Sequence, residues 1–217
     1  MSEEAYLGRQ PILDPRGALA AFELLFRGPH KPQAQRSFPR DLDDLQATAR
    51  VLVHALTDIG IVDSLGPYPG YLNVDHSLLA SDLVTVLPPQ RFVLEVLETT
   101  AVDRALAERL AELRRLGYRI ALDDVVAADD PRLALLPLVD IVKVDLLAGG
   151  AARLAPLLER LRPSGKTLLA EKVETLGQFE VARNAGFDLF QGYFFASSTP
   201  VRWGCAGRSS RSGMRSA

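Results

Sequence analysis

Short apolar runs alternate with longer segments of helical period along most of this 217-residue chain. Runs that are apolar on both faces and alternate with helices are typical of a parallel sheet covered by helices. Roughly eight such strands favour a closed βα barrel over an open sheet. The runs are YLGRQPIL, ALAAFELLF, GYLNVD, RFVLEVLE, YRIALDDV, DIVKVD, TLLAEKVE and FDLFQGYFF. The pattern therefore predicts an α/β barrel.

Two of the intervening segments have a clear helical period. They are residues 41–60, DLDDLQATARVLVHALTDIG, and residues 101–117, AVDRALAERLAELRRLG. In the second, Leu106, Leu110, Leu113 and Leu116 fall on one stripe, with charged residues opposite. Apolar residues at this spacing indicate a helix that packs against a core.

Composition excludes several classes of protein. With 47% hydrophobic residues the chain can bury one substantial core, and a net charge of −2 gives no basis for binding DNA, RNA or an anionic membrane. The single cysteine, Cys205, excludes an internal disulfide framework and a cysteine-based zinc cluster, which fits a reducing compartment. No stretch has the roughly 20 apolar residues of a membrane span, and no signal core opens the chain. We therefore expect a cytoplasmic protein.

Polar residues interrupt the apolar runs within or at the far ends of the predicted strands. The carboxyl ends of barrel strands converge on one mouth, so these side chains should meet there. Carboxylate and amide oxygens suit Mg²⁺, Mn²⁺ or Ca²⁺ and not a thiolate-seeking metal. The residues are Glu23, Asn73, Glu95, Asp123, Lys143, Glu171 and Gln191.

The run YRIALDDVV ends in adjacent like charges, Asp123 and Asp124. Adjacent carboxylates cost free energy unless a cation or hydrogen bonds offset them. A solvated turn and a metal site are both consistent with this pattern.

Simpler interpretations exist for individual residues. Asn73 alone would be a turn residue, and Gln191 alone a surface amide. Lys143 could extend to solvent, but its apolar neighbours favour a buried, paired lysine. The three histidines, His30, His54 and His76, show no ligand spacing. Only the recurrence of polar residues at corresponding strand ends favours a functional site.

The motifs ELLFR, LNVD, VLEVLE, ALDDV, VKVD, AEKVET and FQGYFF, in this order over residues 6–195, resemble the EAL family of cyclic di-GMP phosphodiesterases and receptors. The segments LGRQPILD, FELLFR and LLAEKVET are most similar in sequence to the EAL part of EAL-HDOD proteins, in which a signalling module follows the EAL domain. The resemblance implies a TIM-like barrel with one antiparallel strand. It also implies that cyclic di-GMP is bound and hydrolysed to linear pGpG with Mg²⁺ or Mn²⁺, Ca²⁺ being an inhibitory occupant.

The resemblance also implies a role for each matching residue. The first metal would be held by Glu23, Asn73, Glu95 and Asp123, while Asp124 would turn toward a second metal and offset the charge of the aspartate pair. Arg27 would hold a phosphate, since its planar fork binds phosphate oxygens bidentately. The remaining implied roles are a bound water oriented by Lys143, metal or water held by Glu171, support of the site by Gln191, and a loop anchor at Glu174.

The chain departs from the family wording at two places near the site. The aspartates continue as DDVVAADDPRL where active members usually read DDFGTG, and Lys172 replaces the glycine of the usual EGVE. The second metal is thereby placed in doubt. The expected function is a phosphodiesterase domain of weak activity; the alternative is an inactive EAL module that acts as a cyclic di-GMP receptor or a protein-interaction scaffold.

The last segment, SSTPVRWGCAGRSSRSGMRSA, is rich in Ser, Gly and Arg and has little apolar periodicity. It predicts a barrel domain over residues 1–195 and a disordered tail over 196–217. The last helix of the family fold would then be missing or altered. Barrel surface left uncovered would favour a homodimer or a partner protein.

Overall fold

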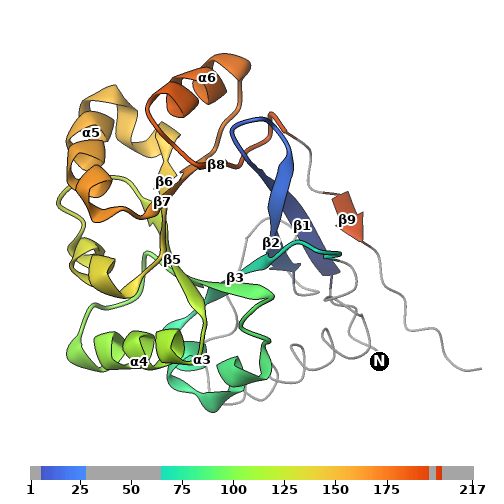
Figure 1. The fold of residues 1–217 in the computed structure, drawn as a ribbon, viewed down its shortest axis with the longest axis vertical. Coiled ribbons are helices and arrows are strands. Elements are labelled where there is room, and N and C mark those ends of the chain that lie inside the picture. The colour runs from blue at the N-terminus through green and yellow to red at the C-terminus, as the bar shows by residue number, and fades with distance from the viewer. Residues whose placement is uncertain (1–5, 28–64, 196–198, 202–217) are drawn as a thin grey trace, which may run out of the picture.

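The computed structural model describes residues 6–27, 65–195 and 199–201. The strands within these ranges form one nine-stranded sheet in the order β2-β3-β4-β5-β6-β7-β8-β1-β9, and a further β2–β1 pairing closes β1 to β8 into a barrel (Figure 1). The closed α/β barrel predicted from the sequence is confirmed. The strands are β1 (Tyr6–Leu13), β2 (Leu19–Arg27), β3 (Gly70–Val74), β4 (Phe92–Val96), β5 (Arg119–Val125), β6 (Ile141–Asp145), β7 (Thr167–Glu171), β8 (Leu189–Phe190) and β9 (Thr199–Val201).

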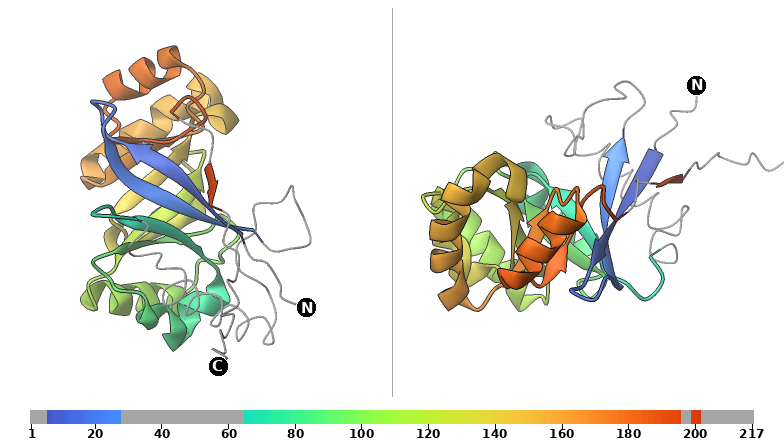
Figure 2. Two further views of the ribbon diagram at one scale, coloured as in Figure 1. Left: turned by 90° about the vertical axis from the view of Figure 1, so that its right-hand side faces the viewer. Right: turned by 90° about the horizontal axis from the view of Figure 1, so that it is seen from above.

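The first strand is the reversed one. Neighbouring strands from β2 to β8 are parallel, whereas β1 pairs antiparallel with both β2 and β8. Figure 2 shows the β1–β2 hairpin on the side of the barrel away from helices α4 and α5. The prediction of one antiparallel strand in the barrel is confirmed.

A short strand lies within the segment predicted to be a tail. Residues Thr199–Val201 form β9, which pairs antiparallel with β1 at Leu7 to Arg9. The rest of residues 196–217 lies outside the described residues. The domain boundary at residue 195 and the disorder beyond it therefore stay predictions.

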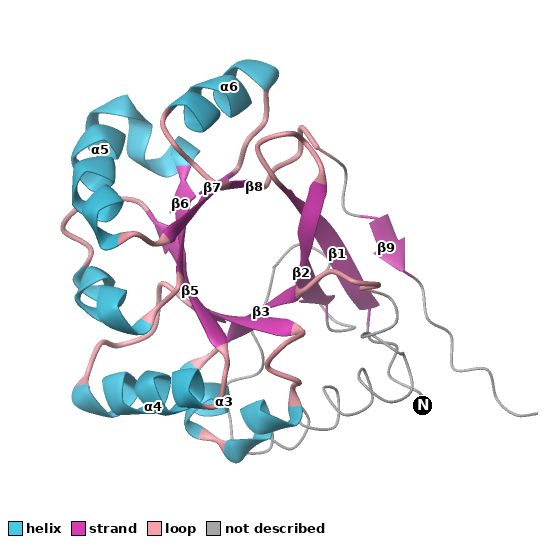
Figure 3. Cartoon of the chain, in the orientation of Figure 1, coloured by secondary structure: helices cyan, strands magenta, loops and turns pink. Residues whose placement is uncertain are grey.

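Helices lie outside the strands of the barrel (Figures 1 and 3). Carboxylates or a hydroxyl cap several of them: Asp103 before α4, Asp145 before α5 and Thr175 before α6 each accept hydrogen bonds from backbone N–H groups of the first turn. The α-helices are α3 (His76–Ala80), α4 (Arg104–Arg115), α5 (Leu146–Leu161) and α6 (Leu176–Asn184), and the 3₁₀ helices are η1 (Asp82–Val86), η2 (Pro131–Leu138) and η3 (Arg162–Ser164). The predicted helix over residues 41–60 lies outside the described residues, and no described helix is long and apolar enough to span a membrane.

The leucine stripe of α4 is confirmed except at its end. Leu106, Leu110 and Leu113 are buried against the barrel, but Leu116 is 51% exposed. Leu116 follows the last residue of the helix, and the chain then turns at Gly117 (φ +94°), so the helical spacing no longer applies there.

The inside of the barrel has two layers that follow from the two-residue period of strands. The lower layer is apolar and comprises Ile12, Ala21, Tyr71, Val93, Ala121, Ile141 and Leu169, with Leu189 packed against it. Two residues further along β2 to β7, and just past the end of β8, come Glu23, Asn73, Glu95, Asp123, Lys143, Glu171 and Gln191. The apolar layer therefore closes the barrel beneath a polar layer at the carboxyl mouth.

Gly192 sets the position of the chain after β8. A Cβ at this position would lie 2.1 Å from the carbonyl oxygen of Val173, while the N–H of Val173 donates to the carbonyl of Gln191 at 3.0 Å. The close approach of these two backbones holds Gln191 beside the segment after Glu171.

We expect Gly192→Ala to lower the free energy of unfolding by about 2 kcal/mol or more, because backbone atoms must move to admit the methyl group. Gly177→Ala is the matched control, since a Cβ there meets only Thr175 Oγ1, at 4.0 Å, and alanine should stabilise helix α6 by about 0.5 to 1 kcal/mol. Urea unfolding of the three proteins measures both effects. Equal stability of Gly192→Ala and wild type would contradict the close-packing argument.

Candidate active site

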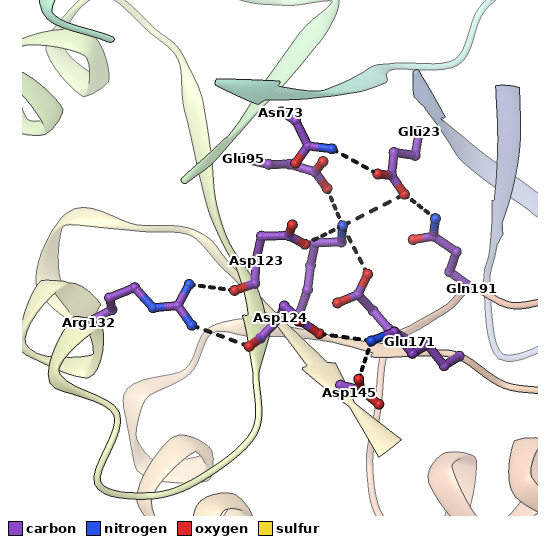
Figure 4. Close-up of polar contacts among 11 residues, drawn as sticks. Glu23, Asn73, Glu95, Asp123, Asp124, Arg132, Asp145, Glu171 and Gln191 are labelled. Atoms are coloured by element: carbon purple, nitrogen blue, oxygen red, sulfur yellow. Dashed lines mark hydrogen bonds and ion pairs between the residues drawn. The ribbon is translucent and has the colours of Figure 1, made fainter. Parts of the chain in front are cut away.

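The polar layer of the barrel is centred on the ammonium group of Lys143, whose side chain is 1% exposed. Lys143 Nζ lies 2.6 Å from Glu95 Oε1, 2.7 Å from Asp123 Oδ1 and 3.0 Å from Glu171 Oε1 (Figure 4). Glu23 Oε2 is further away, at 3.8 Å. Four carboxylates from four strands thus surround one buried cation, and the convergence predicted from the sequence is confirmed.

Two amides orient Glu23 at the edge of this cluster. Asn73 Nδ2 donates to Glu23 Oε1 at 3.1 Å, and Gln191 Nε2 donates to Glu23 Oε2 (Figure 4). Asn73 and Gln191 are therefore neither a turn residue nor a surface amide, since both contact a buried carboxylate. The carbonyl oxygens of both amides have no hydrogen-bond partner among the described residues.

The cluster has more negative than positive charge, and burial makes this imbalance costly. Burial alone would lower the pKa of Lys143, but the surrounding carboxylates raise it well above its usual value, so the ammonium stays charged. Burial raises the pKa of Glu95 well above its usual range, in spite of the nearby ammonium. Burial likewise raises the pKa of Glu171 to about 8. Without a further cation, the folded protein therefore holds protons on part of the cluster near neutral pH.

Several buried oxygens in the cluster have no hydrogen-bond partner among the described residues. They are Asn73 Oδ1, Glu95 Oε2, Glu171 Oε2 and Gln191 Oε1. Unpaired buried oxygens of this kind are rare and call for a ligand. Oxygen-only donors with excess negative charge suit a hard divalent cation.

The donor chemistry thus fits a cation such as Mg²⁺ or Mn²⁺. Within residues 6–27, 65–195 and 199–201, no group of His, Cys, Asp or Glu side chains is already arranged around a metal-sized space. The carboxylates of Glu95, Asp123 and Glu171 contact the ammonium of Lys143 instead. Binding of a cation would therefore require the carboxylates to divide between the ammonium and the metal.

A β-bulge separates the two adjacent aspartates. Leu122 pairs with Val142 and Val125 with Val144, so β5 has one residue more than β6 over this stretch. Asp124 has a left-handed backbone with φ of 52°. The bulge allows Asp123 to reach Lys143 while Asp124 points to a different partner. Each of the two carboxylates is therefore paired with a cation of its own.

That partner is Lys172, which follows β7. Its Nζ lies 3.2 Å from Asp124 Oδ1 and also contacts Asp145 Oδ2 at the end of β6. Burial lowers the pKa of Lys172, but the hydrogen bond to Asp145 and the charge of Asp124 raise it to about 12. Burial would raise the pKa of Asp145, but hydrogen bonds from Lys172 and from two backbone N–H groups hold this pKa below its usual value. Asp145 also caps helix α5. This second cluster was not predicted from the sequence.

Arg132 is a further residue of the site that sequence reasoning missed. Arg132 is only 4% exposed. Its NH1 group donates to the carbonyl oxygen of Asp123 at 2.5 Å, and its NH2 group donates to that of Asp124 at 3.3 Å. Asp130 pairs with the same guanidinium at 2.7 Å and caps η2. Arg132 therefore holds the bulge in place. In the sequence, Arg132 directly follows residues 127–131, AADDP, in which Asp130 caps η2.

Other predicted site residues have less defined surroundings. Arg27 is the last residue of β2, but its side chain lies outside the described residues, and its phosphate-binding role stays a prediction. Glu174 is exposed, so its role as loop anchor also stays a prediction. His76, which showed no ligand spacing in the sequence, is exposed at the start of α3.

The closed barrel, the reversed first strand and the oxygen-rich carboxyl mouth define a βα-barrel domain of the kind whose chemistry sits at its strand ends. The family model described as "EAL domain" matches residues 4–198. The chain belongs to the EAL domain family.

Two curated relatives are similar over most of the chain. The protein named Cyclic di-GMP phosphodiesterase CdgJ of Vibrio cholerae is 36% identical over 199 residues, which cover 91% of this chain and 45% of that protein. The uncharacterized protein YuxH of Bacillus subtilis is 33% identical over 195 residues, which cover 88% of this chain and 46% of YuxH. The chain thus spans about half the length of these relatives.

Solved structures share the fold. The Bacillus subtilis YkuI protein, solved with cyclic di-GMP and calcium, has a TM-score of 0.73 and 21% identity, over 93% of this chain and 56% of that one. Klebsiella pneumoniae BlrP1, solved with manganese and cyclic di-GMP, has a TM-score of 0.70 and 24% identity, over 91% of this chain and 56% of that one. Both agree with the barrel described above.

We expect Lys143→Met to lower the free energy of unfolding by about 3 to 5 kcal/mol in a metal-free buffer, because it leaves buried carboxylates without their counter-ion. Lys166→Met, at a partly exposed lysine before β7, should change stability by less than about 0.5 kcal/mol. Denaturant unfolding at pH 7.5 compares the two. Equal effects of both substitutions would show that the ammonium does not hold the cluster together.

We also expect the metal-free protein to lose stability as pH rises between about 4.5, the ordinary pKa of Glu171, and about 8, its pKa in the fold. The raised pKa means that the folded state binds this proton more tightly than the unfolded state, so losing it favours unfolding. Glu171→Gln should show a smaller decline, with Glu95 supplying the remainder. Urea unfolding at pH 5.5 and 8.5 in the presence of a chelator measures the difference, and parallel pH profiles for the two proteins would contradict the assignment.

Proposed function

We propose that this domain binds cyclic di-GMP in the presence of Mg²⁺ or Mn²⁺ and hydrolyses it slowly to linear pGpG. The observation that carries the proposal is the cluster of buried, unpaired oxygens around Lys143 at the carboxyl mouth of an EAL barrel. Membership of a family that includes a relative named as a cyclic di-GMP phosphodiesterase supports the substrate.

Glu23, Asn73, Glu95 and Asp123 would hold one divalent cation, with Glu171 at its side. Each supplies an oxygen close to the others, and Asn73 Oδ1 and Glu95 Oε2 have no competing partner among the described residues. A divalent cation at such a site polarises a phosphoryl oxygen and lowers the pKa of water. Mg²⁺ and Mn²⁺ are the proposed cofactors, and Ca²⁺ would bind the same oxygens.

The chain's own residues have distinct parts in the proposed reaction. The Lys143 ammonium remains charged and can stabilise negative charge that develops at the phosphate oxygens. Glu171 has a pKa of about 8 without metal and lies beside Lys143, so it is suited to holding or accepting a proton near neutral pH. Gln191 and Asn73 fix the direction of Glu23. Arg27 would bind a phosphate of the dinucleotide.

The alternative is a domain that binds cyclic di-GMP without turnover, as a receptor or protein-interaction scaffold. The pairing of Asp124 with Lys172 favours this reading, because it withdraws Asp124 from the proposed metal site. Exposed apolar side chains on α6 and after β8 would suit a homodimer or a partner protein; they are Leu176, Val181, Tyr193 and Phe194. In either case we expect the domain to act in the cytoplasm and to bind neither DNA nor RNA.

The test is to incubate wild type and variants with cyclic di-GMP and Mn²⁺ and to follow pGpG by chromatography, with binding measured by calorimetry. Glu23→Ala and Lys143→Ala should lower turnover by at least about 10²-fold, because they remove a metal oxygen and the charge at the reacting phosphate. Arg27→Ala should weaken binding by roughly 10- to 100-fold, the worth of a charged hydrogen bond. Glu108→Ala, on the exposed face of α4, should change neither quantity.

The outcomes separate the two functions. Slow turnover that Glu23→Ala removes supports the enzyme, and binding without turnover supports the receptor. Rapid turnover by wild type would contradict the expected effect of the DDVVAADDP segment. Absence of both binding and turnover would refute both readings that involve the dinucleotide.

A further inference from the structure

A second group of charges lies beside the Lys143 cluster at the same mouth. Asp124 and Asp145 come from the ends of β5 and β6 (Figure 4). Lys172, which directly follows β7, contacts both carboxylates. The Asp145 side chain is only 2% exposed, whereas Lys172 is half exposed. One lysine thus pairs with two carboxylates that adjoin the site.

Asp145 has one oxygen available for this contact. Its Oδ1 accepts from the N–H groups of Leu147 and Ala148 at the start of α5, at 2.7 Å and 3.0 Å, while Oδ2 faces the Lys172 ammonium. Asp124 Oδ1 faces the same ammonium. The ammonium therefore has the position that a cation shared by these two carboxylates would have.

Glu171 connects the two groups. Its Oε1 contacts Lys143, while its Oε2 is buried and has no hydrogen-bond partner among the described residues. Its neighbour in the chain is Lys172, and the β6–β7 register pairs Glu171 with Asp145. A buried carboxylate oxygen without a partner, next to two further carboxylates, is the kind of donor that a second divalent cation would use.

The backbone conformation at position 172 does not favour a lysine, whereas the contacts of the lysine side chain do. Lys172 has φ of 56°, in the left-handed region where glycine is unstrained and a long side chain is disfavoured. The ammonium offsets this strain through its contacts with Asp124 and Asp145. Lys172 is therefore explained by what its charge contacts and not by the conformation of the chain.

We propose that the Lys172 ammonium is a tethered cation in the place where a second divalent cation of a two-metal site would lie, so that removing it creates a site for one additional cation. The proposal deepens the proposed function, since it concerns the metal content of that same site. It implies that the domain binds its dinucleotide with one exchangeable divalent cation, and that the second positive charge is part of the chain.

The experiment counts Mn²⁺ bound per chain by equilibrium dialysis and by the electron paramagnetic resonance signal of free Mn²⁺, without any dinucleotide. Lys172→Gly should bind one Mn²⁺ more than wild type, because it frees Asp124 and Asp145 beside Glu171 Oε2, which has no hydrogen-bond partner among the described residues, while glycine tolerates the backbone conformation. Lys172→Met, which removes only the charge, should also gain a site. Adding Asp124→Asn to Lys172→Gly should remove the gained site.

Circular dichroism confirms that each variant is folded before the ions are counted. Equal Mn²⁺ counts in wild type, Lys172→Gly and Lys172→Met would overturn the proposal, as would a gained site that survives Asp124→Asn. The first cation is tested separately by Glu23→Ala in the wild-type background. Loss of no Mn²⁺ in that variant counts against the proposed function, whereas the increment on changing Lys172 decides this proposal.

Discussion

The contact of the Lys143 ammonium with the surrounding carboxylates is the interaction on which the rest of the mouth depends. Four acidic side chains from different strands could not be buried at one point without a cation, and the lysine supplies one from within the barrel. Its single charge does not balance the group: burial raises the pKa of Glu95 and of Glu171 in spite of the ammonium, and several oxygens have no hydrogen-bond partner among the described residues. The folded domain therefore carries a built-in affinity for more positive charge.

The fold and the inner ring of residues could be predicted from the sequence because both follow from the period of a strand. A buried apolar side chain predicts the direction of the polar side chain two positions further along the strand. The pairs are Tyr71 and Asn73, Val93 and Glu95, and Ile141 and Lys143. Repetition of this spacing over many strands places the polar residues in one layer. Helical spacing was less dependable at a terminus, as the exposed Leu116 shows.

The second cluster could not be predicted in the same way, because it depends on local backbone geometry. One extra residue in β5 directs Asp124 out of the alternation, and the left-handed conformation of Lys172 directs its side chain toward β6. Neither feature follows a regular spacing in the sequence. A glycine at position 172 would have indicated a left-handed backbone, whereas a lysine does not. Arg132 could not be predicted for a related reason. It binds backbone carbonyl oxygens, which every residue has, so the sequence does not mark its partners.

The reversed direction of β1 has a consequence for how the domain could be influenced from outside. Tyr6 pairs with Arg27, so the chain enters β1 beside the carboxyl end of β2, and Gln10 then lies opposite Glu23. In a barrel made only of parallel strands the chain would enter at the far end, beneath the apolar layer. Because Gln10 pairs with Glu23, a mechanical force or a bound partner that displaces the first strand would act directly on the strand that carries a carboxylate of the site.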